Sequence, residues 1–433
     1  MKRIFSPEVI IRNHILLVLL AFLAFLSQGM LLAGDQNGNL QVGRAMVNIT
    51  PSTPIPMSGY GGREGPFEGI HDSLYTRVIV FDDGARKAAL ISADVIGFSH
   101  EFWRRITRKI QAETTIDSHY VLLNATHNHG GPVTRVYSET ESPDVLAYAE
   151  DLEQNILDAV NYAAANLQPA RLGFGQGTCK MNMNRRARNA DGGITLGKNP
   201  YGPADHTVGV IKIENAQKTP FALFINWPCH GTVMGGRNYQ ITGDWPGAAA
   251  RYVESSLGNN PVAAITAGAS GDIDPIYRVL PEFGSRGEAE VTGIILGEEV
   301  VRVSQQIETY PFGTIRSLQR VITLPGKQRG DSYQPQETYE PGPDVTVRLT
   351  TLQIGPIVLV GISGEVMTDI GMQIKEQSPY KSTVVITHCN GSSGYLVTDE
   401  TYDQGGYEAM ATRVMAGAEQ SIISHVLDMI YSL

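Results

Sequence analysis

Residues 121–132 read VLLNATHNHGGP, an apolar run that leads directly into two histidines and a glycine-rich turn. The run favours a buried β-strand, and Gly130-Gly131-Pro132 allows other chain segments to approach closely. His127 and His129 point to the same side if the backbone stays extended. Two imidazoles placed in this way suit a metal ion or an anionic transition state, although a lone His-x-His also occurs at ordinary strand ends.

Further apolar, β-branched runs along the chain end in the same way as the first. The strands predicted from residues 222, 262, 357 and 383 each end in glycine together with His, Asp, Glu, Asn or Tyr. Polar residues that gather just past strand ends are where α/β sheets build their sites, because the buried strands hold the loops rigidly. These ends, with the one after residue 121, predict a single shared pocket.

The whole pattern predicts an α/β fold in which mixed β-sheet layers are flanked by helices, with a metal site at the strand ends. Ser99 and Ser142 are expected to cap two of the helices, and proline follows Ser142 at the first helical position. We expect residues 326–344 to form a polar loop and one amphipathic helix to close the chain. Because no internal repeat or long linker is visible, we predict a single large domain over residues 34–433.

The composition limits which classes of binding partner are expected. A chain with 42% hydrophobic and 18% charged residues is globular, and a net charge of -10 without a basic block argues against nucleic acid. Elimination leaves a small-molecule, lipid or glycan substrate. Cys179, Cys229 and Cys389 are too few for a disulfide framework, although one bridge among them stays open.

The N-terminus predicts a signal peptide over residues 1–33. Lys2 and Arg3 precede an almost unbroken apolar run, residues 15–26, and a small-residue region ends near Ala33. The run is short for a spanning helix, so we expect an exported protein, either periplasmic or secreted. An uncleaved membrane anchor stays open as an alternative, because apolar residues recur shortly beyond the run.

Residue chemistry alone selects a set of candidate metal ligands. Imidazole nitrogen and carboxylate oxygen around an open position form the donor set of hydrolytic zinc, which lowers the pKa of a bound water to about 7. All the candidates follow predicted strand ends. They are His127, His129, His230, Asp272, Asp274 and Glu365.

The motifs taken together resemble the neutral/alkaline, non-lysosomal ceramidase family. The stretch NATHNHGGP is similar to that family's Thr-His-Thr-His-Ser-Gly-Pro motif. The other matches follow in the family's order and span nearly the whole mature chain. They are Val47-Asn48-Ile49-Thr50-Pro51, Asn184-Arg185, His230-Gly231-Thr232, Gly271-Asp272, Gly364-Glu365, Tyr395-Leu396-Val397-Thr398 and Tyr407-Glu408.

The resemblance implies a mononuclear zinc amidohydrolase that cleaves a linear N-acyl amide with a zinc-activated water. Matching the motifs position by position assigns the Zn²⁺ ligands to His127, His230, Glu365 and Tyr395. The same matching places His129, Arg185 and Tyr407 against the reacting carbonyl, where they stabilise the developing oxyanion. The implied substrate is a small-molecule or lipid N-acyl compound, which belongs to sphingolipid metabolism if it is ceramide.

Asp274 departs from the family pattern, because it stands where the family's Gly-Asp-Val-Ser-Pro motif has a catalytic serine. We count Asp274 among the catalytic residues, and its role stays open between a general base, a ligand of a second cation and recognition of a cationic or hydroxyl-bearing substrate. A second departure is the end of the chain soon after Tyr407. We therefore expect the family's C-terminal β-sandwich domain to be missing.

Two alternatives to the amidase remain. In one, Asp272 and Asp274 recruit a second metal and the substrate is an ester or another non-ceramide compound. In the other, the chain is a non-catalytic binding protein that kept the metal pocket. Nucleic acid is not an expected partner, whereas peripheral membrane contact and the oligomeric state are left open.

Overall fold

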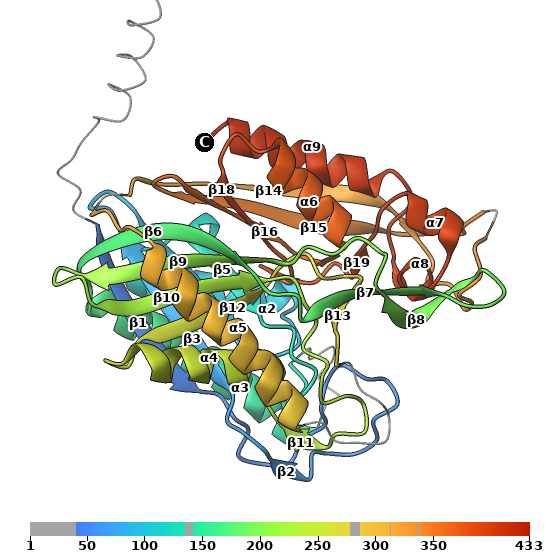
Figure 1. Cartoon of the computed structure of the whole chain (residues 1–433), viewed down its shortest axis with the longest axis horizontal. Coiled ribbons are helices and arrows are strands. Elements are labelled where there is room, and N and C mark those ends of the chain that lie inside the picture. The colour runs from blue at the N-terminus through green and yellow to red at the C-terminus, as the bar shows by residue number, and fades with distance from the viewer. Residues whose placement is uncertain (1–39, 135–141, 278–285, 312, 337) are drawn as a thin grey trace, which may run out of the picture. The chain divides into compact units, whose positions relative to one another are not determined.

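A computed structural model describes residues 40–134, 142–277, 286–311, 313–336 and 338–433 (Figure 1). These ranges belong to the compact unit Asn39–Leu433. The predicted signal peptide lies outside them. Within the described ranges, no helix combines the length and the apolar character needed to cross a membrane.

The larger of two main sheets is mixed, as predicted. Its strands follow the order β12 (Val262–Ala267), β10 (Pro220–Trp227), β9 (Thr207–Asn215), β6 (Gln168–Thr178), β1 (Gln41–Asn48), β3 (Tyr75–Asp82), β4 (Lys87–Ala93) and β5 (Val121–Ala125). The β10–β12 and β4–β5 pairs are parallel and the others antiparallel. The sheet curls so that β4 and β12 lie close together, and the Ser92 hydroxyl of β4 donates a hydrogen bond to the Ile265 carbonyl of β12.

A second sheet packs against the first. Its order is β14 (Ile315–Lys327), β15 (Pro341–Ile354), β16 (Ile357–Ile362) and β18 (Ser382–Ile386), with β16 and β18 parallel. Leu352, Leu359 and Ile386 of this sheet share one buried core with Ile79 and Phe224 of the larger sheet. The ends of β16 and β18 are thereby fixed beside the larger sheet.

Short β-ribbons carry several of the polar residues of the candidate site. They are β2 (Gly69–Ile70) with β11 (Gln240–Ile241), β7 (Asn182–Arg188) with β8 (Ile194–Asn199) and β13 (Ile273–Pro275), and β17 (Glu365–Val366) with β19 (Tyr395–Leu396). The β17–β19 pair is parallel and sets Glu365 opposite Tyr395. Such short strands hold only a few residues each, so the main sheets around them must supply the rigidity.

Helices cover the outer faces of both sheets (Figure 1). The larger sheet carries α2 (His100–Thr114), α3 (Pro143–Ala165), α4 (Asp244–Leu257) and α5 (Arg286–Gln306), while the smaller carries α6 (Thr368–Gln377) and α9 (Ala418–Tyr431). The predicted caps are confirmed, because Ser99 and Ser142 accept hydrogen bonds from the backbone N–H groups of Phe102 and Val145. Shorter helices are η1 (Ser118–Tyr120), α7 (Glu400–Gln404) and α8 (Tyr407–Ala411).

The α/β fold class is confirmed, but two local predictions were wrong. The expected single closing helix is divided into α7, α8 and α9, because Gly405, Gly406 and Gly417 have φ values of 71°, 93° and 92° that a helix does not contain. The expected polar loop 326–344 is partly strand. Pairing of Lys327 with Pro341 extends the β14–β15 ladder into it.

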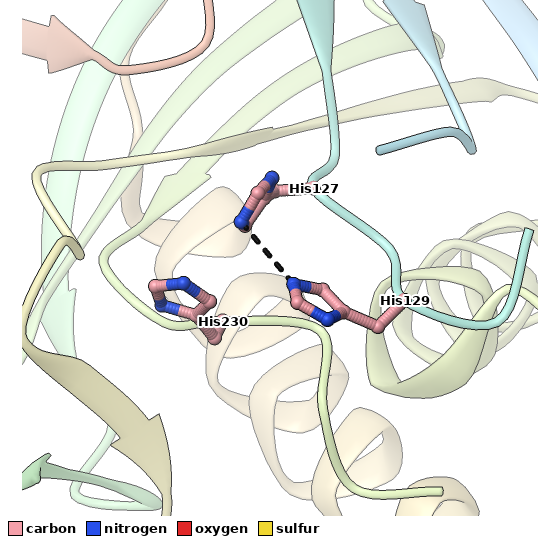
Figure 2. A group of neighbouring side chains, drawn as sticks. All are labelled: His127, His129 and His230. Atoms are coloured by element: carbon pink, nitrogen blue, oxygen red, sulfur yellow. Dashed lines mark hydrogen bonds between the residues drawn. The ribbon is translucent and has the colours of Figure 1, made fainter. Parts of the chain in front are cut away.

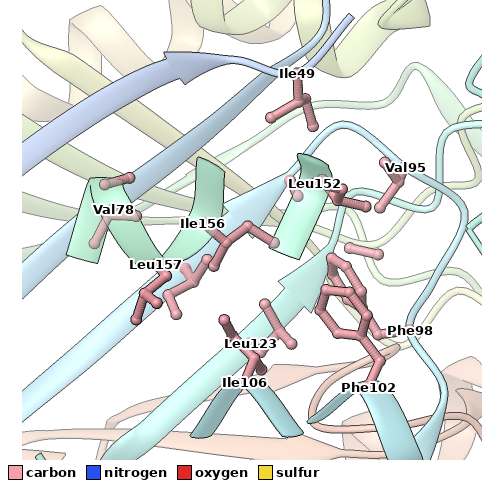
Figure 3. Close-up of a cluster of buried hydrophobic side chains, with 14 of the residues drawn as sticks. Ile49, Val78, Val95, Phe98, Phe102, Ile106, Leu123, Leu152, Ile156 and Leu157 are labelled. Carbon is pink, nitrogen blue, oxygen red and sulfur yellow. The ribbon is translucent and has the colours of Figure 1, made fainter. Parts of the chain in front are cut away.

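The core beneath α2 and α3 gives a direct test of this packing. Figure 3 shows Ile156 of α3 among apolar side chains that include Val78, Ile106 and Leu123, and Ile156 is 0% exposed. We expect Ile156→Ala to lower the free energy of unfolding by about 2–5 kcal/mol in urea titrations, because it leaves a cavity. Tyr162→Ala on the same helix, at a residue 61% exposed, should change it by less than about 0.5 kcal/mol. Equal losses in both variants would contradict the packing.

Candidate metal centre

The two histidines after β5 converge, but not by the predicted route. The backbone does not stay extended, because His127 has a φ of 57° in the left-handed region. The rings of His127 and His129 are nevertheless neighbours, with their Nε2 atoms 3.3 Å apart and their planes at 89° (Figure 2). The turn at His127, and not strand alternation, brings them together.

His230 joins this pair from the end of β10. The His129 N–H donates a hydrogen bond of 3.0 Å to the Gly231 carbonyl, which ties the loop after β5 to the loop after β10. The His230 ring centroid lies 4.7 Å from that of His127 (Figure 2). Ligand atoms of His127, His129 and His230 all lie within 4.8 Å of one another, which is close enough for a shared ion.

Glu365 supplies a carboxylate to the same point from the smaller sheet. Its Oε2 lies 3.7 Å from His127 Nε2 and 3.6 Å from His230 Nε2, and this buried oxygen has no hydrogen-bond partner within 3.5 Å. Burial acts to raise the pKa of Glu365, but the neighbouring imidazoles outweigh burial and hold its pKa well below the usual range. The carboxylate is therefore ionised and available to a cation.

The hydrogen bonds of both imidazoles fit metal binding. His127 Nδ1 lies 2.8 Å from the Ile96 carbonyl and His230 Nδ1 lies 3.0 Å from the Ile273 carbonyl. Since a carbonyl only accepts, each Nδ1 carries a proton, so Nε2 is the nitrogen of each ring that can bind a metal. Zinc bonds of about 2.0–2.1 Å in tetrahedral geometry place ligand atoms about 3.3 Å apart, so small movements would let this donor set close on an ion.

Tyr395 stands beside Glu365 in the β17–β19 pair. Its hydroxyl accepts a hydrogen bond of 3.0 Å from Arg185 Nη2. Burial, followed by the negative charge of Glu365, raises the pKa of Tyr395 well above that of a free phenol. The protein groups alone therefore keep the phenol protonated, and only a cation at bonding distance would favour the phenolate.

Tyr60 and Gly59 pack closely against the His129 ring. The Tyr60 ring meets the His129 ring edge-on with centroids 5.0 Å apart. A Cβ on Gly59, which has a φ of 99°, would lie 2.5 Å from His129 Nδ1, so only glycine fits there. Burial, and then the nearby His127 and His230 imidazoles, hold the pKa of His129 well below 6.5, so this imidazole is neutral.

Arg185 is the cation of the site and comes from β7. Its Nη1 lies 3.3 Å from His230 Nε2 and 3.4 Å from Asp274 Oδ1, and its Nε donates to Glu408 Oε1 at 2.8 Å. Burial acts to lower the pKa of Arg185, but Tyr395, Asp274 and Glu408 together raise it well above its usual value. The guanidinium therefore stays charged although it is buried.

The two aspartates after β12 have different partners. Asp274 Oδ1 accepts a hydrogen bond of 3.3 Å from the Thr232 hydroxyl and faces Arg185. Asp272 is committed to the fold, because its two oxygens accept from the Thr368 N–H and from Asn184 Nδ2, both at 2.8 Å. Burial raises the pKa of Asp272 to about 6. Both oxygens of Asp272 are thus occupied, which argues against the second metal.

Tyr407 closes the site from α8, where it is the first residue. Its ring lies 5.6 Å from that of Tyr395, and the Arg185 guanidinium lies 5.7 Å from the Tyr407 ring centroid. The eight residues to which the sequence assigned a ligand or catalytic role thus lie in one connected cluster. The cluster joins loops after strands of both sheets, as the strand-end pattern predicted.

The sequence pattern missed two residues of this cluster. The His388 ring stacks on that of His127 with centroids 3.6 Å apart, although His388 follows β18 and the strand-end pattern could have selected it. Glu408 is 0% exposed and bridges Arg185 and Arg186 with contacts of 2.8 Å each. The only available signal for Glu408 was its position next to Tyr407.

Removing the Glu408 charge should destabilise the whole cluster. Glu408→Gln removes the carboxylate that both buried guanidinium groups contact and leaves Asp274 to face Arg185 alone, so we expect the free energy of unfolding to fall by about 3–5 kcal/mol. Gln404→Ala is the control, because Gln404 Oε1 accepts one hydrogen bond of 3.0 Å from Arg186, and Arg186 keeps its contact with Glu408 in this variant. The control should lose less than about 1.5 kcal/mol in the same denaturant titration. Similar losses in the two variants would show that the charge bridge is not what matters.

Comparison with known proteins agrees with this architecture. Residues 40–279, more than half of the chain, match the family model of the neutral/alkaline non-lysosomal ceramidases, N-terminal part. The chain therefore belongs to this ceramidase family. Among curated relatives, neutral ceramidase A of Dictyostelium discoideum is 29% identical over 265 residues, and neutral ceramidase of Mycobacterium tuberculosis is 28% identical over 242 residues.

These matches cover only part of the relatives. The aligned regions are 56% and 51% of this chain but 37% and 36% of the two relatives. The crystal structure of neutral ceramidase from Pseudomonas aeruginosa matches with a TM-score of 0.78 at 19% identity, over 92% of this chain and 74% of that one. A ceramidase complexed with C2 matches with a TM-score of 0.79 at 18% identity, over 92% and 75%. The structural matches establish the fold.

Proposed function

We propose that this protein is an exported zinc-dependent amidohydrolase that cleaves the amide bond of an N-acyl lipid. The observation that carries the proposal is the convergence of His127 Nε2, His230 Nε2 and Glu365 Oε2, with carboxylate-to-imidazole distances of 3.7 and 3.6 Å. Tyr395, beside Glu365, completes the proposed ligand set. Membership of the ceramidase family and the fold shared with a ceramidase complexed with C2 support an N-acyl lipid as substrate.

The protein groups around the proposed ion fit acyl transfer to water. Zinc, when bound, supplies a water of lowered pKa and polarises the substrate carbonyl. Arg185 remains charged, and its guanidinium is fixed by Glu408 before substrate arrives. With His129 and Tyr407 it presents donors to the carbonyl oxygen as negative charge develops there, which is most effective when the donors are preorganised.

Asp274 takes the place of the family's serine as the residue that moves a proton. Its carboxylate lies within 3.4 Å of Arg185 Nη1, next to the proposed oxyanion donors. In this position it can accept a proton from the attacking water and pass it to the leaving nitrogen. The amine then departs neutral, and the acyl group leaves as a carboxylic acid, which loses its proton to solvent.

Export follows from the N-terminal residues 1–33. The basic start and the apolar run have the lengths of a signal peptide. A substrate in or near a membrane is consistent with such a destination. Mass spectrometry of the mature N-terminus tests this part separately from the chemistry.

The first functional test is metal-dependent amide hydrolysis. Zinc-loaded wild type should hydrolyse members of a panel of N-acyl amides that includes a fluorogenic ceramide, with esters as comparison substrates. His127→Ala removes one proposed ligand and should abolish both stoichiometric zinc binding and hydrolysis. His425→Ala, at a distant histidine whose Nδ1 lies 2.7 Å from the Ser421 carbonyl, should leave both unchanged. A panel in which zinc-loaded wild type hydrolyses no amide contradicts the amidase proposal.

A second test isolates the proton transfer. Asp274→Asn keeps the shape of the side chain but cannot take up a proton, so kcat should fall by about 10²–10⁴-fold. Zinc stoichiometry should stay at the wild-type value, because Asp274 is not a proposed ligand. An unchanged kcat would remove Asp274 from the catalytic residues, and a kcat loss accompanied by zinc loss would make it part of the metal centre.

A further inference from the structure

His388 lies against the proposed metal centre, yet none of the catalytic or ligand roles described above uses it. Its ring is stacked face to face on the His127 ring, with centroids 3.6 Å apart and planes within 10°. The two residues come from different sheets, because His127 follows β5 of the larger sheet and His388 follows β18 of the smaller. The stack is thus a direct side-chain contact between the two sheets at the candidate site.

The backbone around His388 is fixed from both sides. The His388 N–H donates to the Gly364 carbonyl at 3.0 Å, directly before Glu365, and the His388 carbonyl accepts from the Ala125 N–H at 3.4 Å. His388 has a φ of 52° and His127 a φ of 57°. This left-handed conformation is uncommon for residues other than glycine and persists where the surrounding structure imposes it.

The geometry of the stack indicates support and not ligation. An imidazole lone pair lies in the plane of its ring, so two parallel rings 3.6 Å apart do not direct lone pairs at one ion. The edge of the His127 ring is already held, because Nδ1 lies 2.8 Å from the Ile96 carbonyl. His388 covers a face of the same ring. The Nδ1 contact at the ring edge and the stacked His388 ring on the ring face together fix the direction in which His127 Nε2 points.

We propose that His388 is a positioning residue of the metal centre, which holds the plane of the His127 ring by stacking and thereby strengthens zinc binding. The proposal rests on the metal centre of the proposed function, but not on the identity of the substrate. It requires a flat ring at position 388 and not an imidazole nitrogen. This requirement separates it from a role as an additional ligand.

The test is zinc affinity, measured with Zn²⁺ alone in competition with a chromophoric chelator. We expect His388→Ala and His388→Gln, which remove the ring, to weaken zinc binding by about 10–100-fold, whereas His388→Phe, which keeps a flat ring, stays within about threefold of wild type. His425→Ala, at a histidine on α9, is the matched control and should match wild type. Thermal unfolding of the zinc-free proteins confirms that each variant is folded.

Each other outcome overturns the proposal. Equal loss in His388→Phe and His388→Ala would assign His388 a polar role, and unchanged affinity in His388→Ala and His388→Gln would make the stack incidental. If His388→Ala does not fold, the comparison of His388→Gln with His388→Phe decides in the same way. Absence of zinc binding in wild type would overturn the metal centre together with this proposal, whereas zinc binding without amide hydrolysis would contradict only the amidase activity.

Discussion

Burying a carboxylate costs free energy unless a cation or a hydrogen-bond donor faces it. This constraint determines which side chains lie together at the strand ends. Glu408 and Asp274 are both buried, and the guanidinium groups of Arg185 and Arg186 neutralise them. Glu365 differs, because its Oε2 faces imidazole nitrogens that are 3.6 and 3.7 Å away and has no arginine ion pair among the described residues. The arginines thus account for Glu408 and Asp274, and Glu365 is the carboxylate that a metal ion would satisfy.

Two rigid sheets make this concentration of charge feasible. His127 and His230 follow strands of the larger sheet, whereas Glu365 and His388 follow strands of the smaller. The sheets share one apolar core, so their strand ends cannot separate without exposing it. The short ribbon of β7 and β13 then adds Arg185 and Asp274, and α8 adds Tyr407 and Glu408.

The sequence predicted those parts of the fold and site that depend on local pattern. Apolar runs that end in polar residues located the strands that lead to His127, His230 and Glu365, and Ser99 and Ser142 marked two helix starts. The bridge between Arg185 and Glu408 joins residues 223 positions apart, and no local pattern contains such a contact. The left-handed turn at His127 was also missed, because it is imposed by neighbouring segments of the chain and not by the residue's own preference.

The position of Asp274 shows how one substitution can change a shared site. With a serine at this position, Glu408 would balance the charge of Arg185, although Arg186 contacts Glu408 as well. The aspartate places a second carboxylate 3.4 Å from the Arg185 guanidinium. The extra negative charge compensates the arginine pair and gives the site a group that can accept a proton. The chain thus keeps the family fold, and Asp274 adds to the charge balance around Arg185.

The most direct measurement is anomalous X-ray diffraction at the zinc edge from crystals of the zinc-loaded protein. The account predicts one strong peak about 2.0–2.2 Å from His127 Nε2, His230 Nε2 and a Glu365 oxygen. A peak at the separate His71, Asp72 and Glu290 group, with none between His127 and Glu365, would contradict it.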